Sequence, residues 1–264
     1  MSAFVEVPGG RLEVLDRAGD PRQPALVLLH EGLGSVGLWR SFPDDLRCAT
    51  GLRTVAYSRF GNGRSDAPRR PRTPAFMHEE AREVLPVLLD RLQVERPILV
   101  GHSDGASIAL VYAAGNDVTG LVLLAPHVFV EEMCVAAIAD VAAGFERGLR
   151  ERMARHHDDP RVTFWGWADV WLDPEFRRWS LQPLLSSITA PTLLIQGRDD
   201  EYGTLAQIDT IAAGISAPAE KLVVPGGHSP HLEQPEMVLR AIEGFVRRLL
   251  GRRADGATGR SPPS

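Results

Sequence analysis

A serine between two glycines stands where a strand-like run of residues gives way to a helical one. Residues 97–105 read PILVGHSDG, so Ser103 lies between Gly101 and Gly105. In a strand-to-helix turn of the form G-x-S-x-G, the glycines relieve crowding and the serine hydroxyl is lifted above the sheet. The N-terminus of the following helix favours a developing negative charge there. A short Gly-Ser-Gly stretch can also be a plain turn, but the strand-to-helix context favours Ser103 as a nucleophile.

A serine hydroxyl is a weak nucleophile at neutral pH, so it needs a base, and the base needs an orienting acid. Only two histidines follow the apolar run at 192–196, namely His228 and His231. His228 comes directly after the last apolar run, 221–224, which puts it on a loop at the same sheet edge as Ser103. We therefore predict His228 as the general base and expect His231 to shape the loop or the pocket.

The orienting acid is expected in the loop after the run at 192–196. Three carboxylates follow Gly197 there: Asp199, Asp200 and Glu201. Each could reach a histidine across a loop, so spacing does not choose among them. Glu201 is the least favoured because it is the farthest along the chain.

The elements that must position these residues alternate between short apolar runs and longer helical segments. The runs are 25–29, 53–57, 97–100, 121–125, 192–196 and 221–224, and the clearest helices are 74–92, 103–114 and 235–250. Continuous apolar strands suit a parallel sheet buried on both faces, with helical crossovers between strands. Pro86 should bend or interrupt the first helix. Residues 4–15, broken at Pro8-Gly9-Gly10, predict an antiparallel hairpin that opens the sheet.

The interval 127–187 has no convincing strand and holds four of the five tryptophans, including Trp165, Trp167 and Trp171. We predict a helical cap insertion there, within a core formed by residues 1–126 and 188–250. The tryptophans could line a substrate pocket or form the small core of the cap itself. The polar tail 251–264 is expected to be disordered.

Composition narrows the class of protein. A chain of 264 residues with 44% hydrophobic residues suits one domain, and a net charge of −5 gives no reason to expect nucleic acid or a membrane as partner. The first residues lack a signal-peptide pattern, and no stretch approaches the ~20 apolar residues of a membrane span. We expect a soluble, cytoplasmic protein, with Cys48 and Cys134 as ordinary core or semi-buried thiols.

Several other polar residues are interpreted as structural and not as catalytic or metal-binding. His30 and His102 each end a buried strand and are expected to be hydrogen-bonded structural histidines. Residues 156–159, His-His-Asp-Asp, resemble a metal cluster only on paper, because adjacent residues on a helix cannot all face one ion. We expect a solvated loop there and no metal site.

Taken together, the motifs resemble the α/β-hydrolase superfamily, in particular compact serine esterases, C–C hydrolases and haloperoxidase-like members with a helical cap. The resemblance covers residues 4–250, and its markers are HEGLG at 30–34, YSRFGNGRSD at 57–66, the Ser103 turn, GRDD at 197–200 and GHSPHLEQP at 227–235. It implies an α/β fold with a mostly parallel central sheet of about eight strands, helices on both faces and a helical cap insertion.

The resemblance also assigns roles. The family's acid usually lies three residues after the strand-ending glycine, which selects Asp200 and leaves Asp199 as the alternative. One oxyanion donor is the backbone N–H of Asp104, directly after the nucleophile. The family pattern His-Gly-x assigns the other to Gly32, with Leu33 as fallback. Glu31 stands where the family has glycine. It could disfavour anionic substrates, or it could be solvated or paired with an arginine.

The implied reaction is acyl transfer to water without a metal or organic cofactor. We expect hydrolysis of a small neutral or hydrophobic carboxylic ester, with Leu33, Trp165, Trp167 and Trp171 lining the pocket. A lactone, an amide, a C–C bond or acyl transfer to an alcohol stays open, as does a non-catalytic binder of small molecules. A serine at the turn disfavours the epoxide hydrolases and dehalogenases of this fold, which use aspartate. The expected partner is a small molecule, and the chain is expected to be a monomer or a homodimer.

Overall fold

The fold is built on one eight-stranded sheet. The computed structural model describes the backbone of residues 2–258 and the side chains of residues 2–251. The strands are β1 (Ala3–Val7), β2 (Gly10–Arg17), β3 (Leu26–Leu29), β4 (Thr54–Tyr57), β5 (Ile98–His102), β6 (Gly120–Leu124), β7 (Thr192–Gly197) and β8 (Ala219–Val224). Their order across the sheet is β1-β2-β4-β3-β5-β6-β7-β8. The strands from β3 to β8 pair in parallel, whereas β1 and β2 form an antiparallel hairpin. The predicted mostly parallel sheet and its opening hairpin are confirmed.

Helical segments make up the connections. The α-helices are α1 (Phe42–Thr50), α2 (Phe76–Glu79), α3 (Leu85–Arg91), α4 (Asp104–Ala113), α5 (Glu132–Ala143), α6 (Arg150–Met153), α7 (Pro160–Leu172), α8 (Ala206–Gly214), α9 (Pro230–Glu233) and α10 (Pro235–Thr258). Shorter 3-10 turns are η1 (Val36–Trp39), η4 (Phe176–Arg178) and η5 (Gln182–Ser187), and π-helical turns are η2 (Glu80–Val84) and η3 (Phe145–Leu149).

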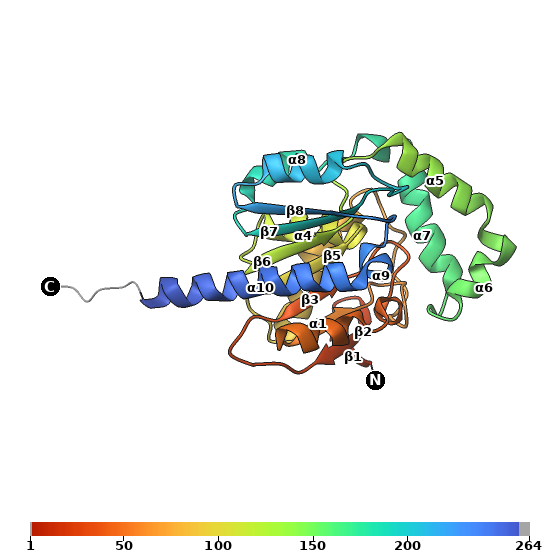
Figure 1. The fold of residues 1–264 in the computed structure, drawn as a ribbon. Helices are drawn as coiled ribbons and strands as arrows, with labels where there is room; N and C mark the ends of the chain where they lie inside the picture. Colours follow the sequence, from red (N-terminus) through yellow and green to blue (C-terminus); the bar gives the residue numbers. More distant parts are fainter. Residues whose placement is uncertain (1, 259–264) are drawn as a thin grey trace.

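Two apolar clusters bury the two faces of the sheet, because alternate residues of each strand point to opposite sides. On one face, Leu28, Val100 and Val122 contact the cluster that contains the apolar residues of α1 and α10. On the other face, Leu29 and Leu99 belong to the cluster that includes α3, α4 and α8. Helices therefore cover both faces, as predicted (Figure 1).

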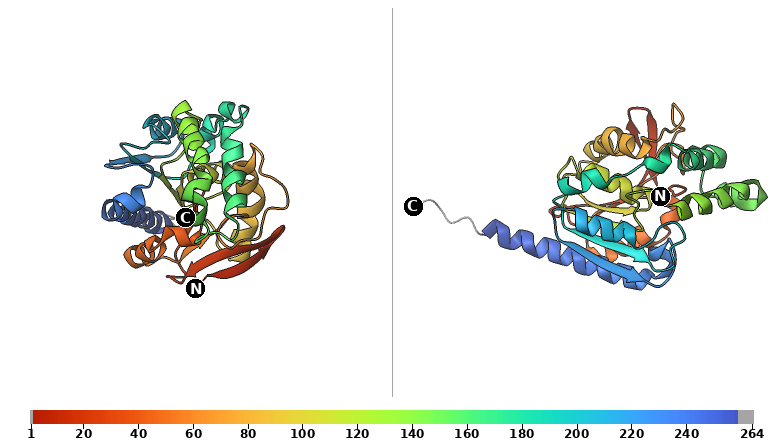
Figure 2. Two further views of the ribbon diagram at one scale, coloured as in Figure 1. Left: turned by 90° about the vertical axis from the view of Figure 1, so that its right-hand side faces the viewer. Right: turned by 90° about the horizontal axis from the view of Figure 1, so that it is seen from above.

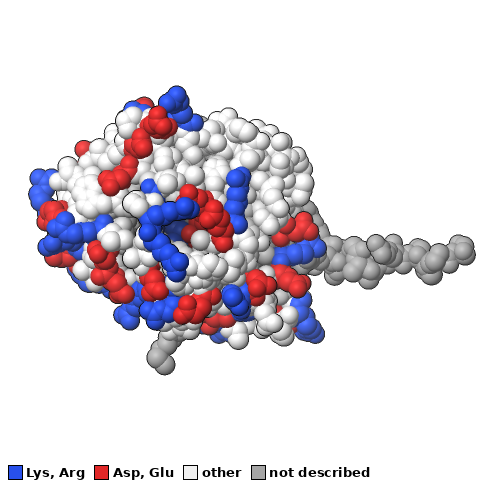
Figure 3. All heavy atoms as spheres, turned by 180° about the vertical axis from the view of Figure 1, so that it is seen from behind, with Lys and Arg blue, Asp and Glu red and all other residues white. Residues whose placement is uncertain are grey.

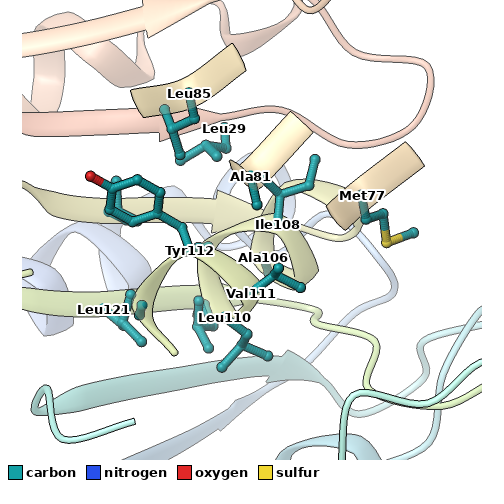
Figure 4. Packing of buried hydrophobic residues seen from close by; sticks show 14 of the residues in the cluster. Leu29, Met77, Ala81, Leu85, Ala106, Ile108, Leu110, Val111, Tyr112 and Leu121 are labelled. Carbon is teal, nitrogen blue, oxygen red and sulfur yellow. The ribbon is translucent and has the colours of Figure 1, made fainter. Parts of the chain in front are cut away.

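Helix α4 lies at the centre of the second cluster. Its Ile108 and Val111 pack among apolar residues of α2, η2 and the sheet, such as Met77 and Ala81 (Figure 4). All ten residues of α4 are buried. A helix that is apolar on every side needs neighbours all round it, and α4 has them in the sheet and in the surrounding helices.

The predicted helix over residues 74–92 is present but interrupted. The π-helical turn η2 separates α2 from α3, and Pro86 lies in the first turn of α3. Proline lacks the N–H that would continue the α-helical hydrogen bonds, so the regular pattern breaks just before it. The interruption expected at Pro86 is confirmed.

Between β6 and β7 the chain leaves the sheet and forms α5, α6 and α7. These helices gather at one side of the molecule, on the right in Figure 1 and facing the viewer in the left view of Figure 2. The residues before α5 and after α7 lie side by side. Phe129 forms an isolated β-bridge with Ser180, and the Leu181 N–H donates to the Val128 carbonyl at 2.8 Å. Apart from that single bridge, every regular element between β6 and β7 is helical. The absence of a strand pattern in the sequence led us to expect this.

Helix α10 runs past Gly251 to Thr258, so backbone helix extends into the segment 251–264 that we expected to be disordered. Residues 259–264 lie outside the described part, and for them that expectation stays a prediction. Within residues 2–258, none of the helices combines the length and the apolar character that crossing a membrane requires.

The charged side chains show no grouping by sign on the face drawn in Figure 3, where basic and acidic residues are interspersed. Both cysteines are free thiols, and Cys134 is buried as expected. The expectation of a core or semi-buried position is wrong for Cys48, which is exposed. The face drawn in Figure 3 therefore shows no extended basic surface, and the two described cysteines do not form a disulfide.

Candidate active site

The turn at Ser103 has the strained backbone that the sequence pattern predicts. Ser103 has φ 53° and ψ −120°, in the positive-φ region that side chains with a Cβ rarely adopt. A Cβ at Gly105 would lie 2.0 Å from the Leu29 carbonyl oxygen, and one at Gly101 would lie 2.4 Å from the Ala106 Cα. The two glycines are thus required because neighbouring backbone approaches them too closely for any side chain.

The imidazole of His228 lies against the Ser103 hydroxyl. Its Nε2 atom is 2.9 Å from Ser103 Oγ. His228 follows β8, and Ser103 follows β5, so the two loops meet at the carboxyl edge of the sheet. At this distance the imidazole can accept the hydroxyl proton directly.

A carboxylate holds the opposite side of the same ring. His228 Nδ1 lies 2.9 Å from Asp200 Oδ1 and 3.0 Å from Oδ2. Asp200 also accepts hydrogen bonds from the Tyr202 N–H and from Gln196 Nε2, each at 2.8 Å. Of the three acids that the sequence left open, the structure brings Asp200 to the histidine, while Asp199 and Glu201 are exposed.

These contacts keep Asp200 ionised. Burial acts to raise the pKa of the Asp200 carboxyl, but hydrogen bonds from His228 and from the Tyr202 amide outweigh it, so the pKa lies below its usual range. An ionised carboxylate on Nδ1 favours the tautomer whose Nε2 lone pair faces Ser103. The arrangement can therefore withdraw a proton from Ser103 and stabilise the imidazolium that results.

The loop from His30 to Gly34 is held against this centre by residues of the second sequence motif. The buried Arg59 guanidinium donates to the carbonyls of His30 and Glu31. Asn62 Nδ2 donates to the carbonyls of Gly32 at 3.1 Å and Gly34 at 2.9 Å. The two motifs, 30–34 and 57–66, are therefore parts of one structure. With its carbonyls occupied in this way, the loop is fixed without use of the Gly32 N–H.

Gly32 itself admits no side chain, because a Cβ there would lie 2.1 Å from Trp167 Nε1. His30 is buried, and its ring contacts the Glu31 carbonyl and the Arg59 N–H. This agrees with the structural role expected for His30.

A cavity of about 200 Å³ opens beside Ser103. Its lining residues come from the loops after β3 and β6, from the start of α4, from α5 and α7, and from the loops that hold the histidine and the acid. They are Glu31, Gly32, Leu33, Ser103, Asp104, His127, Cys134, Ile138, Trp167, Trp171, Tyr202 and His228. Ligand pockets usually measure about 300–1,000 Å³, so this one suits a small molecule.

Of the predicted pocket residues, Leu33, Trp167 and Trp171 lie at this cavity and Trp165 does not. Trp165 instead packs edge-on against Phe145 and Phe164, among the insertion helices. Trp167 and Trp171 are four residues apart on α7 and share one helix face, whereas Trp165 is two residues earlier and points elsewhere. The helical period could have separated them from the sequence alone.

Four lining residues were not anticipated: His127, Cys134, Ile138 and Tyr202. Tyr202 could have been suspected from its place two residues after Asp200. The others lie in or next to the insertion, where the sequence carries no motif that indicates which side faces the sheet.

Glu31 lies in the cavity wall, and its carboxylate faces the buried ring of His102. Its Oε2 lies 3.5 Å from His102 Nδ1, an electrostatic contact too poorly aligned for a hydrogen bond. Burial acts to raise the pKa of Glu31, but the adjacent His102 and His30 rings outweigh it and lower the pKa. No ion pair with an arginine is found for Glu31 within the described side chains. The buried His102 also contacts the His228 carbonyl through Nε2 at 2.7 Å, so it supports the histidine loop.

The expectation of a fully solvated loop at residues 156–159 is wrong for His157. That side chain is buried, and its Nδ1 accepts a hydrogen bond from the Gly63 N–H at 2.9 Å. His156, Asp158 and Asp159 are exposed. The side chains described here include no group of three or more residues able to hold a metal ion.

Buried histidines should make the stability of this protein sensitive to acid. Burial lowers the pKa of His231 to about 3, since the ring packs against Trp39 and Phe42 away from water. Below pH 6.5 the unfolded chain binds a proton at this position and the folded chain does not. The free energy of unfolding therefore falls as the pH falls. Between pH 7 and pH 5 His231 should account for a loss of about 2 kcal/mol. His231→Phe should remove that part of the loss, as measured by urea unfolding at the two pH values.

The exposed His156 provides the control. His156→Phe is expected to leave the difference between the two pH values as it is in the wild type. If His231→Phe loses as much stability on acidification as the wild type does, the buried-histidine account is incorrect.

Comparison with known proteins agrees with the geometry. Residues 26–241 match the alpha/beta hydrolase family. The chain is 26% identical over 196 residues to Esterase YbfF of Escherichia coli (strain K12), covering 67% of this chain and 77% of that protein. Its fold is similar to a hydrolase from Pseudomonas aeruginosa PA01, with 25% identity, a TM-score of 0.72 and coverage of 95% and 98% of the two chains. An esterase from Exiguobacterium antarcticum, 19% identical, shares the fold with a TM-score of 0.72 over 94% of this chain and 100% of that one. The match over most of the chain, together with the sheet order and the turn at Ser103, shows that this protein belongs to the alpha/beta hydrolase family.

Proposed function

We propose that the protein is a serine hydrolase that cleaves small carboxylic esters through an acyl-enzyme on Ser103. The observation that carries this proposal is the continuous set of short contacts from Ser103 Oγ through His228 to Asp200, at the wall of a cavity. Membership of a hydrolase family and the likeness to a bacterial esterase support the same reaction.

In the first half of the reaction, Ser103 Oγ attacks the ester carbonyl carbon while His228 Nε2 takes the hydroxyl proton. The tetrahedral intermediate collapses, the bond to the alcohol oxygen breaks, and His228 returns the proton to the leaving alcohol. Water then attacks the acyl-enzyme with His228 again as base, and the carboxylic acid leaves with Ser103 restored. Asp200 holds the ring and stabilises its charged form in both halves.

We assign the oxyanion site to the backbone N–H groups of Asp104 and Gly32. Asp104 is the first residue of α4, so its N–H is free of the helix ladder and lies at the positive end of the helix dipole. Gly32 lies on the cavity wall, on the loop that Asn62 holds through its carbonyls. Such donors act on the charge that develops in the transition state.

The insertion 127–187 would serve as a cap over the site, with residues 1–126 and 188–250 as the catalytic core. Trp167 and Trp171 form part of the cavity wall, and Trp171 Nε1 donates to Asp104 Oδ1 at 3.2 Å. This wall favours neutral or hydrophobic groups, and Glu31 disfavours a carboxylate. The apolar lining and the small volume support a short ester as substrate.

Labelling with a fluorophosphonate tests the proposal, because this reagent traps an activated serine. We expect one label per chain, located on Ser103 by peptide mass spectrometry, and turnover of ethyl butyrate by the unlabelled protein. A label elsewhere, or no label and no turnover, would count against a serine hydrolase and favour a binding protein. Turnover with an added alcohol distinguishes an acyltransferase, which would release the new ester in place of the acid.

A further inference from the structure

Two polar side chains in the wall of the cavity have no hydrogen-bond partner among the described residues. They are His127, in the loop after β6, and Tyr202, in the loop that holds Asp200. The backbone of each residue is bonded, but neither ring nitrogen of His127 and not the Tyr202 hydroxyl forms a hydrogen bond with the described protein. Polar groups in a largely buried site normally have partners, so these atoms require an explanation.

A ligand in the cavity can reach these atoms. The unpaired polar atoms that are fully enclosed by protein, such as Asp104 Oδ2 and His231 Nδ1, do not include the His127 nitrogens or the Tyr202 hydroxyl. His127 is 2% exposed, so the little surface that it presents includes its ring nitrogens. Tyr202 is half-buried. Since both residues line the cavity, their unmet hydrogen-bonding capacity belongs to the space that a substrate must occupy.

The other polar side chains of the wall have contacts of their own or are out of reach. Ser103 is bonded to His228, and the wholly buried Asp104 carboxyl presents no surface to a ligand. The Glu31 carboxylate faces the ring of His102. Most of the remaining wall is apolar or aromatic. The imidazole and the phenol described above are therefore the neutral nitrogen and oxygen groups that can bind a polar part of the substrate.

The protein holds both rings in place through the backbone. The His127 carbonyl accepts from Ser107 Oγ at 2.6 Å, and the next N–H in the chain donates to Gln207 Oε1 at 2.8 Å. The Tyr202 N–H donates to Asp200 Oδ1 at 2.8 Å. Groups that are fixed before a ligand arrives lose little conformational freedom when they bind it, so contacts with them contribute more to affinity.

Both rings lie close to the reacting centre and to each other's loops. The ring centroids of His127 and Tyr202 are 5.5 Å and 4.8 Å from that of His228, whose Nε2 bonds to Ser103 Oγ. A Cβ on Gly203, the residue after Tyr202, would lie 3.4 Å from His127 Cε1. A substrate group that these rings bind is therefore only a few bonds away from the ester carbonyl that Ser103 attacks.

The protonation of the two rings indicates which group they bind. Burial lowers the pKa of His127 to about 3 and raises that of Tyr202 to about 12, so both rings are uncharged at neutral pH. A neutral imidazole has one N–H donor and one acceptor nitrogen, and a phenol both donates and accepts. An alcohol hydroxyl complements this pair because it also donates and accepts. An ammonium ion only donates, and a carboxylate only accepts.

We propose that the site selects short esters that carry a free hydroxyl group, with His127 and Tyr202 as the hydrogen-bond partners of that hydroxyl. The inference rests on the proposed ester hydrolysis and narrows its substrate from any small neutral ester to a hydroxylated one. The hydroxyl would supply the partners that the two rings lack, whereas a purely hydrocarbon ester would leave them unpaired.

Two pairs of esters test the proposal, and in each pair a terminal methyl group is replaced by a hydroxyl of similar size. Ethyl butyrate and ethyl 3-hydroxypropanoate examine the acyl part, and butyl acetate and 3-hydroxypropyl acetate examine the alcohol part. Each kcat/KM is divided by the rate of alkaline hydrolysis, which removes differences in chemical reactivity. A wall without partners would disfavour the hydroxyl, because burying it unpaired is costly. We expect the hydroxylated ester to be preferred by about tenfold or more in at least one pair.

Variants locate the effect. Tyr202→Phe removes the hydroxyl and keeps the ring against His228, and His127→Phe removes both ring nitrogens and keeps an aromatic ring. Each should lower the preference for the hydroxylated ester severalfold. Because the preference compares two substrates of one variant, a uniform loss of activity cancels. Tyr112→Phe is the matched control, since it removes a phenol hydroxyl on α4 outside the cavity, and it should leave the preference unchanged. If His127→Phe does not fold, Tyr202→Phe and the wild-type preference decide.

The failure of this inference is distinguishable from the failure of the proposed function. Turnover of ethyl butyrate and butyl acetate with a corrected preference near or below one in both pairs would overturn the hydroxyl selection and leave the serine hydrolase intact. A preference that persists unchanged in Tyr202→Phe and His127→Phe would overturn the assignment to these two rings. No turnover of any of the four esters, together with no fluorophosphonate label, would remove both proposals.

Discussion

Replacing Ser103 with alanine is expected to lower kcat for ethyl butyrate by about 10⁶-fold, close to the loss seen when a serine nucleophile is removed from a complete triad. The substitution should not disturb the turn, because serine already carries a Cβ at φ 53° and alanine meets the same backbone strain. The measurement is ester turnover, with circular dichroism to establish that the fold is retained.

Ser107→Ala is the matched control on the same helix. Ser107 is also buried, and its hydroxyl donates to the His127 carbonyl at 2.6 Å. We expect it to lose about 1 kcal/mol of stability and to keep activity within roughly tenfold of the wild type. Should Ser103→Ala retain more than about 1% of the wild-type rate, a different group must carry the nucleophilic step.

Replacing Asp200 with asparagine is expected to lower kcat by about 10⁴-fold. The amide cannot accept hydrogen bonds from His228, the Tyr202 N–H and Gln196 Nε2 in the way that a carboxylate does. The imidazole is then free to carry its proton on Nε2, which points at Ser103 and blocks deprotonation. The loss should appear in kcat and in the pH profile of kcat/KM, with little change in the unfolding midpoint beyond that of one lost buried interaction.

Asp199→Asn is the control that separates position from charge. Asp199 is exposed, and among the described side chains the imidazole of His228 pairs with Asp200 and not with Asp199. Near-normal activity is expected. Equal losses in the two variants would mean that the loop, and not the contact between His228 and Asp200, accounts for the effect.

The sequence by itself determined the strand runs, the opening hairpin, the interruption at Pro86 and the strained turn at Ser103. These features depend on local chemistry. Continuous apolar runs predict strands buried on both faces, proline lacks a donor, and glycine alone tolerates the approach of neighbouring backbone at positions 101 and 105. The sequence also showed that the candidate serine, acid and histidine each follow a different predicted strand.

Only the tertiary structure decided which side chains meet. Spacing alone did not choose between Asp199 and Asp200, and Asp200 was favoured only through the family resemblance. In the structure, the direction of one loop brings Asp200 to His228 while Asp199 stays exposed. His157 is buried because its loop reaches Gly63 in a distant motif. Glu31 and Asp104, 73 positions apart in the printed sequence, share a cavity because β3 and β5 are parallel neighbours whose carboxyl ends coincide. Such encounters depend on how separate segments are oriented in space, which local sequence patterns do not encode.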